Sequence, residues 1–206
     1  MIRVNRSGII LLAAGRSSRL GSPKQLLTYK GKSLLRHAVD AALGSEMTPL
    51  IVVLGAHSEL LKKELESEKG VQVIINKGWE EGMASSIRCG VNAAMQTSPS
   101  TDGLIIMVCD QPFVSPALLK RLVDTQHQTG LPVVASGYHS SLGVPALFYK
   151  TFFETLLELE GDTGARKLLK EHKDVVAMVD FPEGVIDIDT ENDYHELQDK
   201  KKREPK

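Results

Sequence analysis

One stretch of the chain, residues 8–24, constrains the fold more than any other. Its first half, residues 8–14, is an apolar run of the kind found in a parallel strand that is covered on both faces. Its second half carries glycines, serines, a proline and the cations Arg16, Arg19 and Lys24. A buried strand that ends in a small cationic loop places N–H groups and positive side chains at a sheet edge, which suits phosphate groups. The spacing matches neither the G-x-x-x-x-G-K-[ST] motif nor the G-x-G-x-x-G motif.

The composition is that of a soluble globular chain with one large α/β domain, since 42% of its 206 residues are hydrophobic and 25% are charged. A net charge of −1 gives no overall basis for binding nucleic acid or a membrane surface. Cys89 and Cys109 fit neither a C-x-x-C motif nor a disulfide framework, which indicates reduced thiols. The histidines show no zinc-type spacing. We therefore expect a cytoplasmic protein.

Two features at the N-terminus and along the chain bear on targeting. Residues 1–15 have the outline of a short signal peptide, but their apolar run has the length of a core strand, which we favour. No apolar stretch approaches the roughly 20 residues of a transmembrane helix.

Apolar runs and helical spacings alternate along the chain, which predicts a parallel sheet with crossover helices. The expected strands are residues 8–14, 50–54, 71–75, 103–108, 132–136, 146–149, 175–179 and 185–188. The expected helices are residues 33–43, 59–66, 83–95, 115–129, 151–159, 163–172 and a final helix from 190. We expect residues 1–199 to form a single domain and residues 200–206 to be a basic, frayed tail.

Four of these helices begin with capping residues. Ser33 and Ser115 have the side chains preferred at the N-cap, and Pro116 suits the first helical position. Asp162 is expected to cap the helix over residues 163–172. Thr190 opens the last helix in the spacing of a capping box.

Asp110 directly follows the apolar strand 103–108. Because ligands of open α/β sheets bind outside the carboxyl ends of the strands, Asp110 should face the same crevice as the cationic loop. A carboxylate there can hold Mg²⁺ together with substrate phosphates. A turn aspartate before Gln111 and Pro112 would explain the residue equally well on its own. Its pairing with the cationic loop favours the metal ligand.

Several other segments admit two explanations. Gly82 to Ser86 lie at a helix start, which suits an anion or polar ligand but also ordinary capping. Trp79 either lines a surface for a planar ring or belongs to the core. Residues 161–166 are either an anion-binding helix start or a turn with a cap that leaves Arg166 an exposed cation. Residues 137–145 form a connection that could bind an acceptor.

Asp187 and Asp189 alternate near the end of the chain. One of them could reach the site as a second metal ligand, and a solvated sheet edge explains both equally well.

Nine positions in the opening stretch resemble the signature L-A-A-G-x-S-x-R-[ML]-G-x-x-K of MobA-like nucleotidyltransferases, a group that includes molybdenum-cofactor cytidylyl- and guanylyltransferases. They are Leu12, Ala13, Ala14, Gly15, Ser17, Arg19, Leu20, Gly21 and Lys24. Further motifs similar to that family follow in the expected order. They lie at Asn76 to Ser86, Cys109 to Pro112, Gly143 to Pro145, Gly161 to Arg166, and Asp187 to Thr190.

This resemblance implies a Rossmann-like, three-layer α/β/α nucleotidyltransferase fold, with an antiparallel strand in a mostly parallel sheet. It implies Mg²⁺-dependent transfer of a nucleoside monophosphate from an NTP, with release of pyrophosphate. The predicted nucleotide-binding residues are Leu12, Ala13, Ala14, Gly15, Arg19, Lys24, Gly82 and Ser85. The predicted acceptor-binding residues are Ser86, Gly143 and Pro145. Arg19, Lys24 and Asp110 are the expected catalytic residues, and Asp110 with Asp189 the expected metal ligands.

The resemblance also bears on the two substrates. Ala14 and the run Cys109 to Pro112 are similar to the cytidylyl branch, whereas guanylyl relatives tend to have glycine at the position of Ala14. We therefore expect CTP as donor, a molybdopterin-type cofactor phosphate as acceptor, and contact with a molybdoenzyme. Val144 departs from the family, which often has histidine there. The alternatives are an NTP transferase for a sugar or alcohol phosphate, or a non-catalytic carrier in molybdoenzyme maturation.

Overall fold

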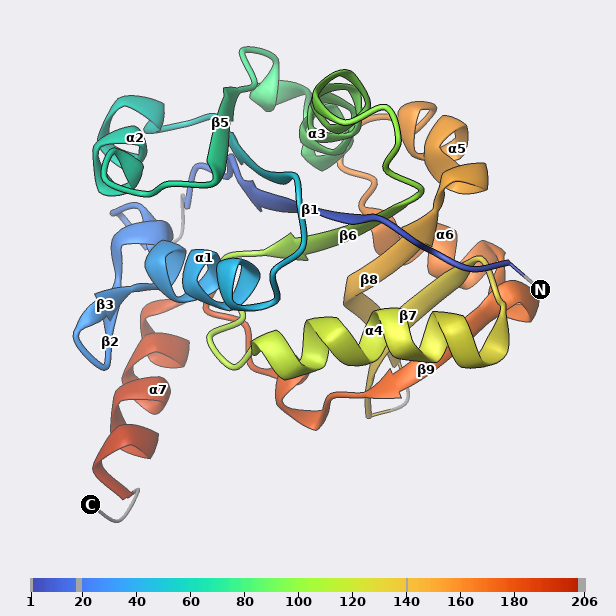
Figure 1. The fold of residues 1–206 in the computed structure, drawn as a ribbon. Helices are drawn as coiled ribbons and strands as arrows, with labels where there is room; N and C mark the ends of the chain where they lie inside the picture. The colour runs from blue at the N-terminus through green and yellow to red at the C-terminus, as the bar shows by residue number, and fades with distance from the viewer. Residues whose placement is uncertain (1, 18–19, 140, 204–206) are drawn as a thin grey trace.

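The computed structural model describes residues 2–17, 20–139 and 141–203. In this part of the chain a seven-stranded sheet lies between two layers of helices (Figure 1). Its strands, in the order in which they lie side by side, are β5 (Val71–Ile75), β4 (Leu50–Leu54), β1 (Ser7–Ala13), β6 (Gly103–Val108), β8 (Ser141–Tyr149), β7 (Val133–Tyr138) and β9 (Val176–Asp180).

Seven α-helices follow or connect these strands in the described part of the chain. They are α1 (Leu34–Gly44), α2 (Ser58–Leu65), α3 (Met83–Thr97), α4 (Pro116–Thr129), α5 (Phe153–Leu157), α6 (Ala165–Glu171) and α7 (Glu191–Arg203). A short hairpin of β2 (Thr28–Tyr29) and β3 (Lys32–Ser33) lies outside the main sheet.

The direction of the strands confirms the predicted fold class. β8 is antiparallel to both of its neighbours, β6 and β7, whereas the other neighbouring strands of the main sheet are parallel. Because the parallel strands all end at one edge, the loops that follow β1 and β6 meet there.

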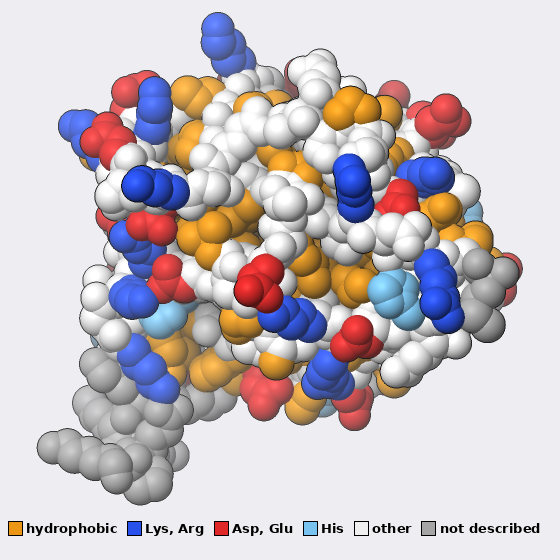
Figure 2. All heavy atoms as spheres, in the orientation of Figure 1, with side chains coloured by type: hydrophobic (Ala, Val, Ile, Leu, Met, Phe, Trp, Pro, Cys, Tyr) orange, Lys and Arg blue, Asp and Glu red, His pale blue; other side chains and the backbone are white. Residues whose placement is uncertain are grey.

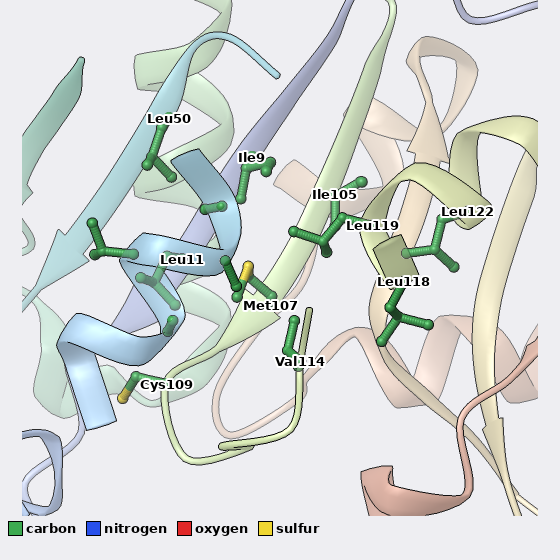
Figure 3. Close-up of a cluster of buried hydrophobic side chains, with 14 of the residues drawn as sticks. Ile9, Leu11, Leu50, Ile105, Met107, Cys109, Val114, Leu118, Leu119 and Leu122 are labelled. Carbon is green, nitrogen blue, oxygen red and sulfur yellow. The ribbon is translucent and has the colours of Figure 1, made fainter. Parts of the chain in front are cut away.

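β1 lies inside the sheet and is covered on both faces. Ile9 and Leu11 face the layer that contains α1, α2 and α4, and Ile10 and Leu12 face the layer that contains α3, α5 and α6. Figure 3 shows Ile9 and Leu11 in the first of these clusters, with Leu119 of α4 nearby. Full burial of an aliphatic side chain of this size contributes about 1.5–3 kcal/mol. The apolar run of β1 therefore anchors both halves of the core.

Two predicted helix starts are confirmed by their caps. The Ser33 hydroxyl accepts a hydrogen bond from the Arg36 N–H at 3.1 Å, and the Ser115 hydroxyl accepts one from the Leu118 N–H at 3.2 Å. Pro116 occupies the first helical position of α4, where no N–H is needed.

The predicted strand over residues 185–188 is wrong. Pro182–Val185 forms a short 3₁₀-helix, and residues 186–189 after it form neither a strand nor a helix. Ile188 is fully buried against a cluster that includes Tyr29 and Leu197. The alternation of apolar and acidic residues reflects this one-sided packing rather than a pleated strand.

The helices predicted over residues 151–159 and 163–172 are shorter than expected. The first divides into a 3₁₀-helix, Lys150–Phe152, and α5. The second is α6, and the expected cap is wrong: Gly164, not Asp162, is the N-cap residue, and no side chain among the described residues caps it.

The final helix, α7, forms as predicted and packs against the β2–β3 hairpin (Figure 1). The Tyr194 hydroxyl and the Gln198 amide both donate to the Thr28 carbonyl, at 2.8 and 2.7 Å. The backbone of α7 continues to Arg203, so the helix includes the first residues of the basic stretch. The division into one domain and a frayed tail remains a prediction.

Charged side chains of both signs are interspersed over the face shown in Figure 2, in keeping with a net charge of −1. In the part of the chain that the structure describes, every helix is too short or too polar to cross a bilayer.

Candidate active site

The loop after β1 lines a cavity of about 340 Å³ at the carboxyl edge of the sheet. We name it the β1 cavity. Leu12, Ala13, Ala14 and Gly15, the predicted nucleotide-binding run, all lie along it, and Trp79 lies on its wall. The structure thus brings this backbone and an aromatic ring to one cavity.

Gln25 holds the shape of this loop, and the sequence interpretation missed it. Its side chain is fully buried, and its amide nitrogen donates to the carbonyls of Ala13 and Gly15 at 3.1 and 2.9 Å. The Ser17 hydroxyl accepts a hydrogen bond from the Lys24 N–H at 3.0 Å. A buried amide can satisfy two carbonyls that a glycine-containing loop leaves unpaired. The one sequence signal for Gln25 was its position, directly after Lys24 at the end of the cationic loop.

Arg19, which we predicted to bind phosphate, lies outside the described residues. Its role stays a prediction.

Gly82 also lines the β1 cavity, and the backbone requires glycine there. Its φ is +109°, and a Cβ atom would lie 2.5 Å from the backbone of Gly161 and 2.6 Å from an Asp162 carboxylate oxygen. The Ala84 N–H donates to the Gly161 carbonyl at 3.1 Å. The start of α3 is therefore fastened to the turn that precedes α6.

Ser85 and Ser86, predicted to bind the nucleotide and the acceptor, are both buried and share Asn76 as a partner. The Asn76 amide donates to the Ser85 and Ser86 hydroxyls at 2.8 and 3.1 Å. The Ser85 hydroxyl lies 2.9 Å from the Gly78 and Gly82 carbonyls and is not on the cavity wall, whereas Ser86 is. Ser85 thus has a structural network, and any role in binding is a prediction.

Lys24 joins the two predicted metal ligands. Its ammonium lies 2.5 Å from Asp110 Oδ2 and 2.8 Å from Asp189 Oδ1. Burial disfavours the charge of Lys24, but the ion pairs with Asp110 and Asp189 outweigh that cost and raise the pKa of Lys24. Lys24 is therefore charged at neutral pH. Partial burial, followed by the charge of Asp110, raises the pKa of Asp187 nearby.

The carboxylates fit a divalent cation. Asp110 Oδ1 is buried and has no hydrogen-bond partner among the described residues, which is costly for a carboxylate oxygen unless a ligand satisfies it. Asp110 and Asp189 reach the same ammonium, so they bring two carboxylates to one point. Mg²⁺ is commonly held by one or two carboxylates, and substrate phosphates complete its shell. The described ranges contain no group of three or more potential His, Cys, Asp or Glu ligands.

Cys109, beside Asp110, is a buried free thiol, and Cys89 is also free. Burial, followed by the charge of Asp110, raises the pKa of the Cys109 thiol to about 12. Cys109 is therefore a neutral thiol at neutral pH. Because the thiolate is the nucleophilic form of cysteine, Cys109 does not act as a nucleophile.

A capping box fixes the backbone at Asp189. Asp193 Oδ2 accepts hydrogen bonds from the N–H groups of Asp189 and Thr190 at 3.1 and 2.7 Å. The Thr190 hydroxyl accepts one from the Asp193 N–H at 3.2 Å, as the sequence spacing predicted. The Ile188 N–H donates to the Asp110 carbonyl at 3.1 Å. The start of α7 therefore places Asp189 beside Asp110.

Replacing Asp193 by alanine is expected to lower the free energy of unfolding by about 1 kcal/mol, the usual cost of a lost cap. Because Asp193 also holds the Asp189 backbone, the affinity for a divalent cation should fall about 10-fold. Urea unfolding and a Mn²⁺ titration followed by electron paramagnetic resonance measure the two effects. Glu196→Ala, an exposed change on the same helix, is the control. Equal Mn²⁺ affinity in the two variants would show that the cap does not position Asp189.

A second cavity, of about 480 Å³, adjoins the first and shares Leu12, Lys24 and Asp110 with it. We name it the β8 cavity, after Val144 of β8 on its wall. Of the predicted acceptor residues, Gly143 and Pro145 are buried in β8 and do not line this cavity, whereas Val144 between them does. Tyr138 and Arg166 line the cavity and were not among the predicted site residues.

Comparison with known proteins gives one family match. The sequence profile of the MobA-like NTP transferase domain matches residues 9–175.

Two curated relatives match nearly the whole chain. The nicotine blue oxidoreductase of Paenarthrobacter nicotinovorans is 29% identical over 200 residues, which cover 91% of this chain and 94% of the relative. The purine catabolism protein PucB of Bacillus subtilis is 29% identical over 195 residues, which cover 90% of this chain and 92% of the relative.

Solved structures share the fold. Rv0371c of Mycobacterium tuberculosis in complex with manganese is 28% identical, with a TM-score of 0.79 over 95% of this chain and 99% of that one. A nucleotidyl transferase from Methanothermobacter is 25% identical, with a TM-score of 0.79 over 97% of this chain and 99% of that one.

Proposed function

The chain belongs to the MobA-like NTP transferase family and is a nucleotidyltransferase, and we propose that it transfers CMP from CTP to the phosphate of a molybdopterin-type cofactor. Pyrophosphate is the second product. We propose that the reaction takes place in the cytoplasm and that the modified cofactor is delivered by contact with a molybdoenzyme.

One observation carries the proposal: the β1 and β8 cavities share a wall that includes Lys24 and Asp110. A group transfer needs a donor and an acceptor on either side of one reacting phosphorus. The β1 cavity offers backbone and an aromatic ring for the base and ribose, and the β8 cavity offers separate room for an acceptor. The cation and carboxylates at the shared wall lie where the phosphates would meet.

Asp110 and Asp189 would hold Mg²⁺ at this wall. When bound, Mg²⁺ neutralises charge on the phosphates of the donor. The manganese in the Rv0371c structure supports a divalent cation in this family, and Mg²⁺ is our choice because its ligands are hard oxygens.

The side chains of this chain act by position and charge. Backbone from Leu12 to Gly15 orients the nucleoside. Lys24, which stays charged, binds the donor phosphates and stabilises the charge that develops on the leaving pyrophosphate. Arg19 is proposed to assist it. Phosphoryl-type transfer depends mainly on such positioning and electrostatics, so the reaction needs no further acid or base from the protein.

The choice of CTP rests on Ala14, which lies on the wall of the β1 cavity and is 7% exposed. One relative is named an oxidoreductase and the other a purine catabolism protein, so the assay below tests several acceptors.

A screen of pyrophosphate release tests the function. Each of CTP, GTP, ATP and UTP is incubated with Mg²⁺ alone, with molybdopterin cofactor, with glucose 1-phosphate and with glycerol 3-phosphate. We expect release from CTP with the molybdopterin cofactor. Release only with one of the other two acceptors would establish the sugar- or alcohol-phosphate alternative. No release from any pair, with folded protein, would leave the non-catalytic carrier.

A further inference from the structure

The β8 cavity has an excess of negative charge on its wall. Asp110, Asp162, Asp187 and Asp189 line it, together with two cations in the described part of the chain, Lys24 and Arg166. Lys24 is paired with Asp110 and Asp189 at the boundary with the β1 cavity. An anionic ligand in the β8 cavity would be repelled by the carboxylates unless a further cation met it.

Arg166 lines the β8 cavity and can supply this further positive charge, and Tyr138 orients its side chain. It lies in the first turn of α6 and is exposed toward the cavity. Its Nη2 donates to the Tyr138 hydroxyl at 3.1 Å, and its guanidinium carbon lies 5.8 Å from the centre of the Tyr138 ring. The guanidinium group has five N–H donors in a planar fork, so this bond leaves donors for a ligand.

Tyr138 is a rigid support for Arg166. It is 6% exposed, and two glycines make room for it. A Cβ atom at Gly143 would lie 1.7 Å from the Tyr138 hydroxyl, and one at Gly184 would lie 2.6 Å from the Tyr138 ring. Gly143 therefore acts on the β8 cavity through Tyr138, which explains in physical terms why glycine stands at this position of β8.

The wall of the β8 cavity also has apolar side chains. Ile106, Val108 and Val144 also line the β8 cavity, and Val108 lines the β1 cavity as well. A ligand that fits has an anionic group and an apolar or planar body.

We propose that Arg166, oriented by Tyr138, binds the phosphate group of the acceptor, which is a phosphate monoester with an apolar body along Val144. This inference rests on the proposed function. An oxygen of the acceptor phosphate forms the new bond to the α-phosphorus of CTP. The bond from that phosphorus to the oxygen bridging to the β-phosphate breaks, and its electron pair leaves with pyrophosphate.

Binding of phenyl phosphate, a small phosphate monoester, tests this role without turnover. Calorimetric titrations use protein saturated with Mg²⁺ and α,β-methylene-CTP, a donor that cannot release pyrophosphate. Arg166→Ala should weaken binding of phenyl phosphate about 10- to 100-fold, as expected for a charge-assisted pair. Tyr138→Phe, which removes only the hydroxyl, should weaken it by a smaller factor. Lys167→Ala, an exposed neighbour on α6, is the control and should stay within about 2-fold of wild type.

The outcomes separate this inference from the function on which it rests. Failure of wild-type protein to bind the CTP analogue would contradict the proposed function. Normal binding of the analogue, with phenyl phosphate bound equally by wild type and Arg166→Ala, would overturn the role of Arg166. So would a wild-type protein that binds the analogue but not phenyl phosphate. Benzyl alcohol, which lacks the phosphate, should show no difference between the variants.

Discussion

Replacing Asp110 by asparagine is expected to reduce kcat about 10³-fold, the largest effect of any single change at the site. Asp110 lines both cavities; its Oδ1 is buried with no hydrogen-bond partner among the described residues, and its Oδ2 lies on the Lys24 ammonium. Asparagine has the same shape but lacks the negative charge that a divalent cation requires. Steady-state pyrophosphate release and a Mn²⁺ titration measure the loss, and both should fall together.

The fold should survive this change, because the backbone contact of Asp110 with Ile188 uses the carbonyl and not the side chain. The thermal midpoint of Asp110→Asn should therefore fall by less than that of Lys24→Met, because Lys24 keeps its ion pair with Asp189. Asp124→Asn, an exposed change on α4, is the control and should leave kcat unchanged. Near-normal turnover in Asp110→Asn would remove Asp110 from the metal site.

Replacing Lys24 by methionine should have two effects of opposite sign. Turnover should fall about 10²- to 10³-fold, because a preorganised cation for the donor phosphates is lost. The apparent affinity for Mg²⁺ should rise severalfold, since the ammonium no longer competes for Asp110 and Asp189. Mn²⁺ competition with Mg²⁺ gives the affinity, and pyrophosphate release gives kcat.

The metal-free Lys24→Met protein should also be less stable, by about 1–3 kcal/mol, because Asp110 and Asp189 lose their shared counter-charge at a partly buried position. Added Mg²⁺ should restore much of this stability. Lys120→Met, which removes an exposed pair with Glu46, is the matched control and should change none of the three quantities. A fall in Mg²⁺ affinity in Lys24→Met would contradict the competition between Lys24 and the metal.

The strands and caps were the part of the fold that the sequence predicted best. Strands 50–54, 71–75 and 103–108 match β4, β5 and β6 at both ends. Proline, glycine or a polar residue bounds each apolar run, except at Cys109, where the turn at Asp110 ends the strand. The helix from Pro116 to Thr129 matches α4 because serine and proline mark its start and Gly130, with a positive φ, its end. The strand predicted over residues 185–188 does not form, because a buried Ile188 between two aspartates gives the alternation of a strand without a partner strand.

The site was predicted in its location but not in its contacts. The buried strand ends predicted Asp110 and the loop from Leu12 to Gly15 at one edge of the sheet, and the structure brings them to one cavity, the β1 cavity. The bonds of Gln25 to loop carbonyls join residues near in sequence, but whether its side chain turns inward depends on the core. Arg166 and Tyr138 are 28 residues apart and meet only through the packing of α6 on β8.

Transfer of label from CTP tests the central claim most directly. Protein with Mg²⁺ and molybdopterin cofactor is given CTP labelled with ³²P at either the α- or the γ-phosphate, and the cofactor and pyrophosphate are separated. The account predicts α-label in the cofactor and γ-label only in pyrophosphate, because the bond to the α-phosphorus is the one that changes partner. Label from the γ-position in the cofactor, or no label from either position, would contradict CMP transfer.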